Sequence, residues 1–193
     1  MTSPKPEIHI EFEPLIETIN NDYYGGRDIS RAFVHWAMRE ILAAQDLSGE
    51  TLQEQTLIGG KGDCGIDGWW FEDDQDPPTL HLFQGKYGTT PLSEKEIDEL
   101  WRAPDNLFDP LREKNEYASQ LARDLTQWLK SGATFSMHFV TMSPIGGTAE
   151  SRAAHHSSGS ELSVRQDGKV VSVPVEFSLC VLRQMKLLPN GFR

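Results

Sequence analysis

The sequence predicts one α/β domain in which a central mixed β-sheet is flanked by helices. Segments with apolar residues at helical spacing alternate along the chain with short runs rich in β-branched and aromatic residues. The 193 residues suffice for a single domain with a sizeable core. Apolar residues make up 38% of the chain and charged residues 24%, which is typical of a folded protein and excludes a largely disordered one.

The first well-marked element is a helix that begins near Asp28. In DISRAFVHWAMREILAA, either Asp28 or Ser30 can serve as the N-cap, and apolar residues recur on one stripe. Glu40 lies seven residues after Phe33 and four after Trp36, so its carboxylate falls on that stripe. Such a residue either carries a function or lies at the edge of the stripe with its head group in solvent.

A β-hairpin is predicted next, from the runs IDGWWF and TLHLFQGKYG. They are separated by EDDQDPP, whose prolines and acidic residues are typical of a chain reversal. If the reversal is centred between Asp76 and Pro77, Asp67 lies directly opposite Lys86. Side chains alternate along a strand, so Gln84 shares their face. The pattern therefore predicts that three polar side chains lie together.

Two more helices and a strand are predicted after the hairpin. PLSEKEIDELWRAPDNLF starts with a capping signature, Ser93 followed by Glu96, and predicts a helix that ends before Pro104. A long amphipathic helix is predicted over 109–130. Its apolar face is expected at Leu111, Tyr117, Leu121, Leu125 and Leu129. The run SGATFSMHFVTM then predicts a buried strand.

These elements place the core domain at residues 1–142. Residues 143–193 are expected to form a loop-rich extension, because 143–168 is rich in Ser, Gly, Ala and His and shows no clear periodicity. The run KVVSVPVEFSLCVL can add one strand, which Pro174 would push to a sheet edge or divide.

Net charge and hydropathy restrict the function. The formal charge is −11 at pH 7, so the chain lacks the overall basic character usual for proteins that hold nucleic acid. A nuclease of this composition needs a local basic strip, a divalent metal or a partner subunit. No run approaches the ~18 apolar residues of a membrane span, and the N-terminus lacks a signal-peptide pattern. We therefore expect a cytoplasmic protein with no membrane partner.

The polar residues of the hairpin have the donors of a magnesium site. Carboxylate and amide oxygens, here those of Asp67 and Gln84, are hard ligands suited to Mg²⁺ or Mn²⁺. Glu40 can supply a second carboxylate, and the carbonyl of Gly85 is a further candidate ligand. Lys86, beside such a metal, can orient or help deprotonate an attacking water and stabilise a pentavalent phosphate. The combination favours phosphodiester hydrolysis.

The same residues carry a resemblance to a known family. GDCGIDG, a short acidic turn and an apolar strand ending in QGKY resemble the D…QxK variant of the PD-(D/E)xK restriction-endonuclease-like superfamily. The closest likeness is to the N-terminal nuclease-like domain of the abortive phage infection (AIPR) family. AFVHWAMREIL and SEKEIDELW are also similar to that domain, so the resemblance covers about residues 28–142.

This resemblance implies a restriction-endonuclease-like core and a Mg²⁺-dependent endonuclease that cleaves DNA or RNA in prokaryotic antiphage defence. It implies Asp67 and Gln84 as the metal-site pair, Lys86 as the catalytic lysine and Glu40 as the helix-borne acid. Besides nucleic acid, the partners to consider are a second copy of the chain and a C-terminal region beyond this sequence.

Non-catalytic interpretations stay open beside this one. Asp67 can be an ordinary hairpin residue in a glycine-rich turn. It can also form a structural ion pair with Lys86, which would explain a lysine within an apolar strand. The alternative function is a sensor or interaction module that keeps the nuclease-like fold and binds a phage protein or a partner chain.

Overall fold

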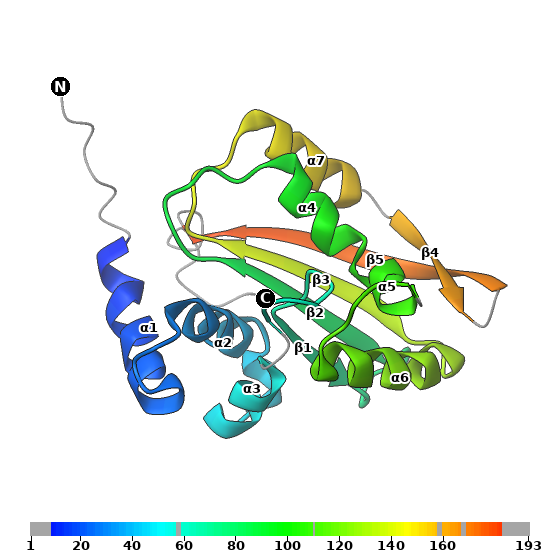
Figure 1. The fold of residues 1–193 in the computed structure, drawn as a ribbon, viewed down its shortest axis with the longest axis horizontal. Helices are drawn as coiled ribbons and strands as arrows, with labels where there is room; N and C mark the ends of the chain where they lie inside the picture. Colours follow the sequence, from blue (N-terminus) through cyan, green and yellow to red (C-terminus); the bar gives the residue numbers. More distant parts are fainter. Residues whose placement is uncertain (1–8, 57–58, 110, 158–159, 167–168, 183–193) are drawn as a thin grey trace.

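The computed structural model describes residues 9–56, 59–109, 111–157, 160–166 and 169–182. They form an α/β fold around one five-stranded mixed sheet with helices packed against it (Figure 1). This confirms the predicted class of a central mixed sheet flanked by helices. Within the described residues, none of the helices is both long enough and apolar enough to cross a membrane.

The strand order in the sheet is β1-β2-β3-β5-β4. The strands are β1 (Gly68–Glu72), β2 (Thr79–Lys86), β3 (Thr134–Thr141), β4 (Ser160–Gln166) and β5 (Lys169–Val181). β2, β3 and β5 run parallel to one another, and β1 and β4 are antiparallel partners at the two edges. The predicted hairpin and the predicted strand after Ser131 are therefore present as β1–β2 and β3.

The helices form two groups. The first comprises α1 (His9–Tyr24), α2 (Ile29–Ile41), the 3₁₀ turn η1 (Ala43–Gln45) and α3 (Gly49–Gln55). The second comprises α4 (Glu94–Trp101), α5 (Ala103–Phe108), α6 (Glu116–Lys130) and α7 (Gly147–Ser157). Leu82 packs with the second group and its neighbour Phe83 with the first. Because side chains alternate along a strand, the two groups cover opposite faces of the sheet.

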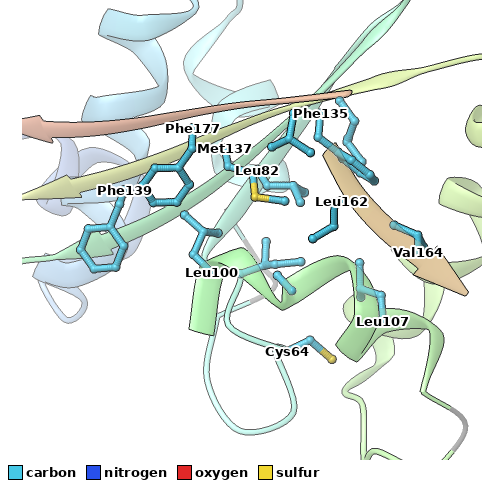
Figure 2. Packing of buried hydrophobic residues seen from close by; sticks show 14 of the residues in the cluster. Cys64, Leu82, Leu100, Leu107, Phe135, Met137, Phe139, Leu162, Val164 and Phe177 are labelled. Carbon is cyan, nitrogen blue, oxygen red and sulfur yellow. The ribbon is translucent and has the colours of Figure 1, made fainter. Parts of the chain in front are cut away.

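The larger core lies between the sheet and α4 to α7, where buried residues of β2, β3 and β5 meet Leu100 and Leu107 (Figure 2). Full burial of each such side chain contributes about 1.5–3 kcal/mol relative to exposure. Leu162 and Val164 of β4 complete this cluster. The second core, around α2, includes Phe33, and it extends to the end of β3.

The expectation of a loop-rich extension after residue 142 is wrong for the described residues. α7, β4 and β5 belong to the same sheet and the same core as the preceding residues. α7 buries Ala149 and Ala153, and a stripe of alanines gives only a weak amphipathic signal. Residues 158–159, 167–168 and 183–193 lie outside the described residues.

Pro174 neither divides β5 nor moves it to an edge. β5 lies between β3 and β4, and Pro174 pairs with Glu161 of β4. Pairing with β3 begins only at Val175. The missing N–H of Pro174 therefore interrupts no pairing with β3, because that pairing starts one residue later.

The predicted helix over 109–130 is shorter than expected. α6 begins at Glu116, because Asn115 caps it with a side-chain oxygen that accepts from the Ala118 N–H at 2.8 Å. Leu111, expected on the buried face, is 93% exposed, and Tyr117 is also exposed. The caps predicted for the other helices are confirmed: Asp28 caps α2, and the Ser93–Glu96 capping box begins α4.

Candidate functional site

The register of the β1–β2 hairpin differs from the predicted one. Gly68 pairs with Phe83, and the N–H of Asp67 bonds to the carbonyl of Phe83, so Asp67 lies beside Phe83 and not opposite Lys86. The reason is that Glu72, predicted to lie in the turn, is the last residue of β1. A shift by two partners leaves the alternation intact, so Gln84 and Lys86 still share a face.

Asp67 is fixed at the end of β1 by two backbone contacts. Its N–H donates to the carbonyl of Phe83 at 2.8 Å, and its Oδ2 accepts from the N–H of Gly85 at 2.9 Å. These two residues flank Gln84 in β2. The carboxylate of Asp67 therefore lies next to the strand end that carries Gln84 and Lys86.

The loop before Asp67 is held by hydrogen bonds between the Asp63 carboxylate and the loop's own backbone. The carboxylate of Asp63 accepts from the N–H of Gly60 at 2.9 Å and from the N–H of Gly65 at 2.8 Å. Gly62 has a φ of +80°, and a Cβ there would lie 2.8 Å from the backbone nitrogen of Asn115. Only glycine fits this conformation and this close approach. Gly62, in the GDCGIDG motif, thus helps to hold the loop that presents Asp67.

A hollow of about 270 Å³ borders Asp67. It is lined by Asp28, Ser30, Arg31, Val34, Gly59, Gly60, Asp67 and Gly85. The first turn of α2 thus forms one wall, and the loop and the end of β2 form the others. α2 approaches the sheet closely here, because a Cβ on Gly85 would lie 2.5 Å from Cγ2 of Val34.

The carboxyl group of Asp67 is in an unfavourable place for a negative charge. Burial raises its pKa to about 6, although the hydrogen bond from Gly85 opposes the shift. The charge of Asp63 raises the pKa further, and that of Arg31 lowers it. A buried carboxylate in this position is stabilised by a proton or by a bound cation.

Lys86 forms its ion pair with Glu96 of α4 and not with Asp67. Glu96 also accepts from the backbone N–H and the hydroxyl of Ser93, each at 2.8 Å. Burial alone would raise the pKa of Glu96, but the hydrogen bonds from Lys86 and Ser93 outweigh it and hold that pKa below its ordinary value. The structural pair between Asp67 and Lys86 is therefore not formed.

Gln84 contributes a buried acceptor to the same strand end. Its Oε1 atom is buried and has no hydrogen-bond partner among the described residues. A buried polar atom without a partner costs about 1–3 kcal/mol, so native structures seldom keep one without an ion or a water. Gln84 shares its strand face with Leu82 and Lys86, toward α4, and it is not among the residues that line the hollow beside Asp67.

Glu40 is not brought to this group. Its exposed carboxylate accepts from the guanidinium of Arg39 at 3.0 and 3.2 Å, and it does not line the hollow. Nine residues of helix separate it from Arg31, which is about 14 Å along the axis. The α2 carboxylate that does border Asp67 belongs to Asp28, which the sequence indicated only as an N-cap.

The oxygen donors fit a Mg²⁺ or Mn²⁺ ion that keeps several waters. Mg²⁺ is usually bound through one or two carboxylates together with water and substrate phosphate. Asp67 and Asp28 supply carboxylates at the hollow, and Gly85 lies in the same wall. No set of three or more His, Cys, Asp or Glu side chains among the described residues is arranged to hold a metal by itself. A cage built entirely from such side chains therefore does not fit.

A second polar cluster lies on the sheet face that α2 covers, and no sequence motif indicated it. Glu72 accepts from Gln45 and lies 3.1 Å from Nε2 of His81. Nδ1 of His81 lies 3.1 Å from Nε2 of His138, and Nδ1 of His138 lies 2.9 Å from the hydroxyl of Ser178. The chain joins β1, β2, β3 and β5, so only the sheet register brings it together.

The carboxylate of Glu72, at one end of this hydrogen-bonded series, determines where the protons of the two histidines lie. Because Glu72 can only accept, Nε2 of His81 carries its proton and Nδ1 accepts from His138. Nδ1 of His138 then accepts from the hydroxyl of Ser178. Burial lowers the pKa of both histidines, to about 3 for His138, so both are neutral at pH 7. Each donor in the chain meets an acceptor.

Comparison of the chain with protein-family models, with curated proteins and with solved structures found no match. The functional assignment therefore depends on the site itself and on the resemblance of its motif.

Proposed function

We propose that this protein is a metal-dependent nuclease with a restriction-endonuclease-like core, which hydrolyses phosphodiester bonds of DNA or RNA with Mg²⁺ or Mn²⁺. The observation that carries the proposal is the buried carboxylate of Asp67 beside a hollow of about 270 Å³ that Asp28 also lines. A role in antiphage defence, in the cytoplasm, is supported by the motif resemblance alone.

The residues divide the work as follows. Asp67, with Asp28 at the opposite wall, would hold the cation, and the motif resemblance adds Gln84 as a further donor. A bound Mg²⁺ supplies a more acidic water and neutralises charge on the phosphate. By the motif resemblance, Lys86, which pairs with Glu96, would orient the water or stabilise the developing charge. In this assignment Asp28 takes the place that the resemblance gave to Glu40.

The test is a metal titration by calorimetry together with a nuclease assay in Mg²⁺ and Mn²⁺ on the same samples. Asp67→Ala should abolish metal binding and cleavage, and Lys86→Ala should lower cleavage by about 10²-fold with metal binding kept. Lys95→Ala is the matched control, because Lys95 is an exposed lysine of α4, next to Glu96 in the sequence. Full cleavage by both site variants would refute the proposal.

Glu40→Ala and Asp28→Asn decide which acid of α2 belongs to the site. The geometry predicts that Asp28→Asn weakens metal binding and that Glu40→Ala leaves it unchanged. The opposite result would restore the assignment implied by the resemblance.

The non-catalytic alternative is favoured by one observation, the neutralisation of Lys86 by Glu96 in an acidic chain. A module of this kind would bind a protein partner and be indifferent to a chelator. No metal response in the unmodified protein, with a partner bound equally well in EDTA, would establish it.

A further inference from the structure

Arg31 is the positively charged side chain at the hollow beside Asp67. Its Nε lies 3.4 Å from Oδ2 of Asp28, and its Nη2 lies 3.4 Å from the carbonyl of Gly59. Both contacts are at the long end for hydrogen bonds, and 33% of the side chain is exposed. The guanidinium is thus placed at the hollow without being tightly held, and its planar fork suits the two oxygens of a phosphate.

The charges around the hollow disfavour an anion unless a cation is present. Three carboxylates act there, because Asp28 lines the hollow with Asp67 and the charge of Asp63 acts on Asp67. Arg31 is the cation among the groups that act on Asp67. A divalent ion would bring these four groups to neutrality, so a phosphate would meet a repulsive site without metal and a neutral one with it.

The hollow leaves room for a phosphate backbone to approach. A Cβ on Gly60 would meet no atom within 4 Å, and one on Gly59 would meet Oδ1 of Asp67 only at 3.4 Å. The acidic turn at 73–76 lies at the opposite end of the hairpin, about 17 Å away at 3.4 Å per residue. At physiological ionic strength this exceeds the Debye length of about 8 Å, so the turn does not repel a strand held at Asp67.

We propose that Arg31 is the phosphate-binding residue of this site, and that the site holds a nucleic-acid backbone only when a divalent cation is bound. The inference rests on the proposed nuclease function. It adds the residue that binds the substrate phosphate and the requirement that the cation binds before the nucleic acid. Because one guanidinium contacts one phosphate, the logarithm of the affinity should fall with the logarithm of salt concentration with a slope of only about −1.

The experiment measures binding rather than cleavage. Fluorescence anisotropy would follow a labelled DNA oligonucleotide, and an RNA of the same sequence, with Ca²⁺ replacing Mg²⁺ or with EDTA. Arg31→Gln should weaken oligonucleotide binding in Ca²⁺ by about tenfold, and Arg31→Lys by less, because it keeps the charge but not the fork. Arg27→Gln is the matched control: it removes the same charge from an exposed residue outside the hollow.

Calorimetry of Ca²⁺ alone separates a phosphate-binding role from a structural one. Removing the positive charge of Arg31 should leave Ca²⁺ affinity unchanged or higher, because less charge then opposes the cation. A loss of both Ca²⁺ and oligonucleotide binding in Arg31→Gln would mean that Arg31 only holds the Gly59 loop, and would overturn the inference.

The remaining outcomes distinguish this inference from the function on which it rests. If the unmodified protein binds oligonucleotide in Ca²⁺ and Arg31→Gln binds equally well, the assignment of Arg31 fails and the nuclease proposal stands. Equal binding in EDTA and in Ca²⁺ overturns the dependence on a cation. If the unmodified protein neither binds nor cleaves nucleic acid with any divalent metal, both proposals fail.

Discussion

The sheet carries two polar clusters that bury ionisable groups in opposite ways. At the end of β1, Asp67 borders a hollow, and the side chains around it converge on open space. Under α2, the chain from Glu72 through His81 and His138 to Ser178 leaves no space, and each group bonds to the next. The first arrangement suits an incoming ligand. The second stabilises the fold that holds the first.

The difference teaches that burial of an ionisable group is not by itself a sign of function. Both clusters contain groups with displaced pKa values, and the displacements come from the same cause, burial. What separates them is geometry: a chain in which each donor has an acceptor is complete, whereas a group of oxygens around a hollow is not. The two clusters should also respond to pH with opposite sign.

The largest expected effect is acid destabilisation through His138. Its pKa is near 6.5 in the unfolded chain and about 3 when folded, so the unfolded state binds the proton first. The stability is complete above pH 6.5 and is lost as the pH falls toward 3, by up to about 5 kcal/mol. Urea unfolding from pH 7 to pH 4 would measure it.

His138→Gln is the matched variant, because glutamine keeps a donor and an acceptor but does not titrate. It should be less stable than the unmodified protein at pH 7 and lose less stability on acidification. Parallel pH profiles for the two proteins would show that the chain does not hold His138 neutral.

The next effect has the opposite sign. The folded pKa of Asp67, about 6, lies above its ordinary value of 3.8, so ionisation of Asp67 costs stability as the pH rises from about 4 to 6. Asp67→Asn should therefore stabilise the protein by about 3 kcal/mol at pH 7 and by nothing near pH 4. Thermal and urea unfolding at both pH values check this.

Metal and a second loop variant sharpen that result. Saturating Mg²⁺ should stabilise the unmodified protein but not Asp67→Asn, because only the ionised carboxylate binds the cation. Asp63→Asn should destabilise at pH 7, since Asp63 accepts from two backbone N–H groups. If Asp67→Asn destabilises as Asp63→Asn does, Asp67 is a structural residue of the loop.

The smallest effect is expected at the end of the histidine chain. Ser178→Ala removes the hydroxyl that donates to Nδ1 of His138 at 2.9 Å and should cost about 1 kcal/mol. Ser136→Ala should cost less, because its hydroxyl lies 3.1 Å from Nε2 of His138, a nitrogen already committed to His81. Equal losses of stability would contradict the assignment of Nδ1 of His138 as the acceptor and Nε2 as the donor.

The sequence predicted those features of the fold that depend on residues close together in the chain. The cap at Asp28, the capping box of α4, the hairpin and β3 follow from signals within a few positions. The register could not be predicted, because the side chain of Glu72 contacts Gln45, which is distant in the sequence, and His81 across the hairpin. The partner of Lys86 likewise lies on a helix, and only packing brings it there.

The site was predicted in part for the same reason. Asp67 and β2 belong to one hairpin, so the contacts of Asp67 with the backbone of Phe83 and Gly85 follow from strand pairing. Arg31 and Asp28 approach only because α2 packs its first turn against the end of β2, where glycine at 85 leaves room. A helix that presents its other end would have brought Glu40 instead, and the periodicity of α2 does not distinguish the two.

The parallel pairing of β2 with β3 also has a consequence for the order in which the protein is made. Thr79 faces Thr134 in the register, 55 positions later in the chain, and the core around α2 includes Val140 and Met142. A two-stranded hairpin is at best marginally stable. After Asp67, Gln84 and Lys86 have been synthesised, the ribosome therefore needs a few seconds more to add β3, on which the folding of this region depends. Until then the nascent chain carries the residues of the site without the site.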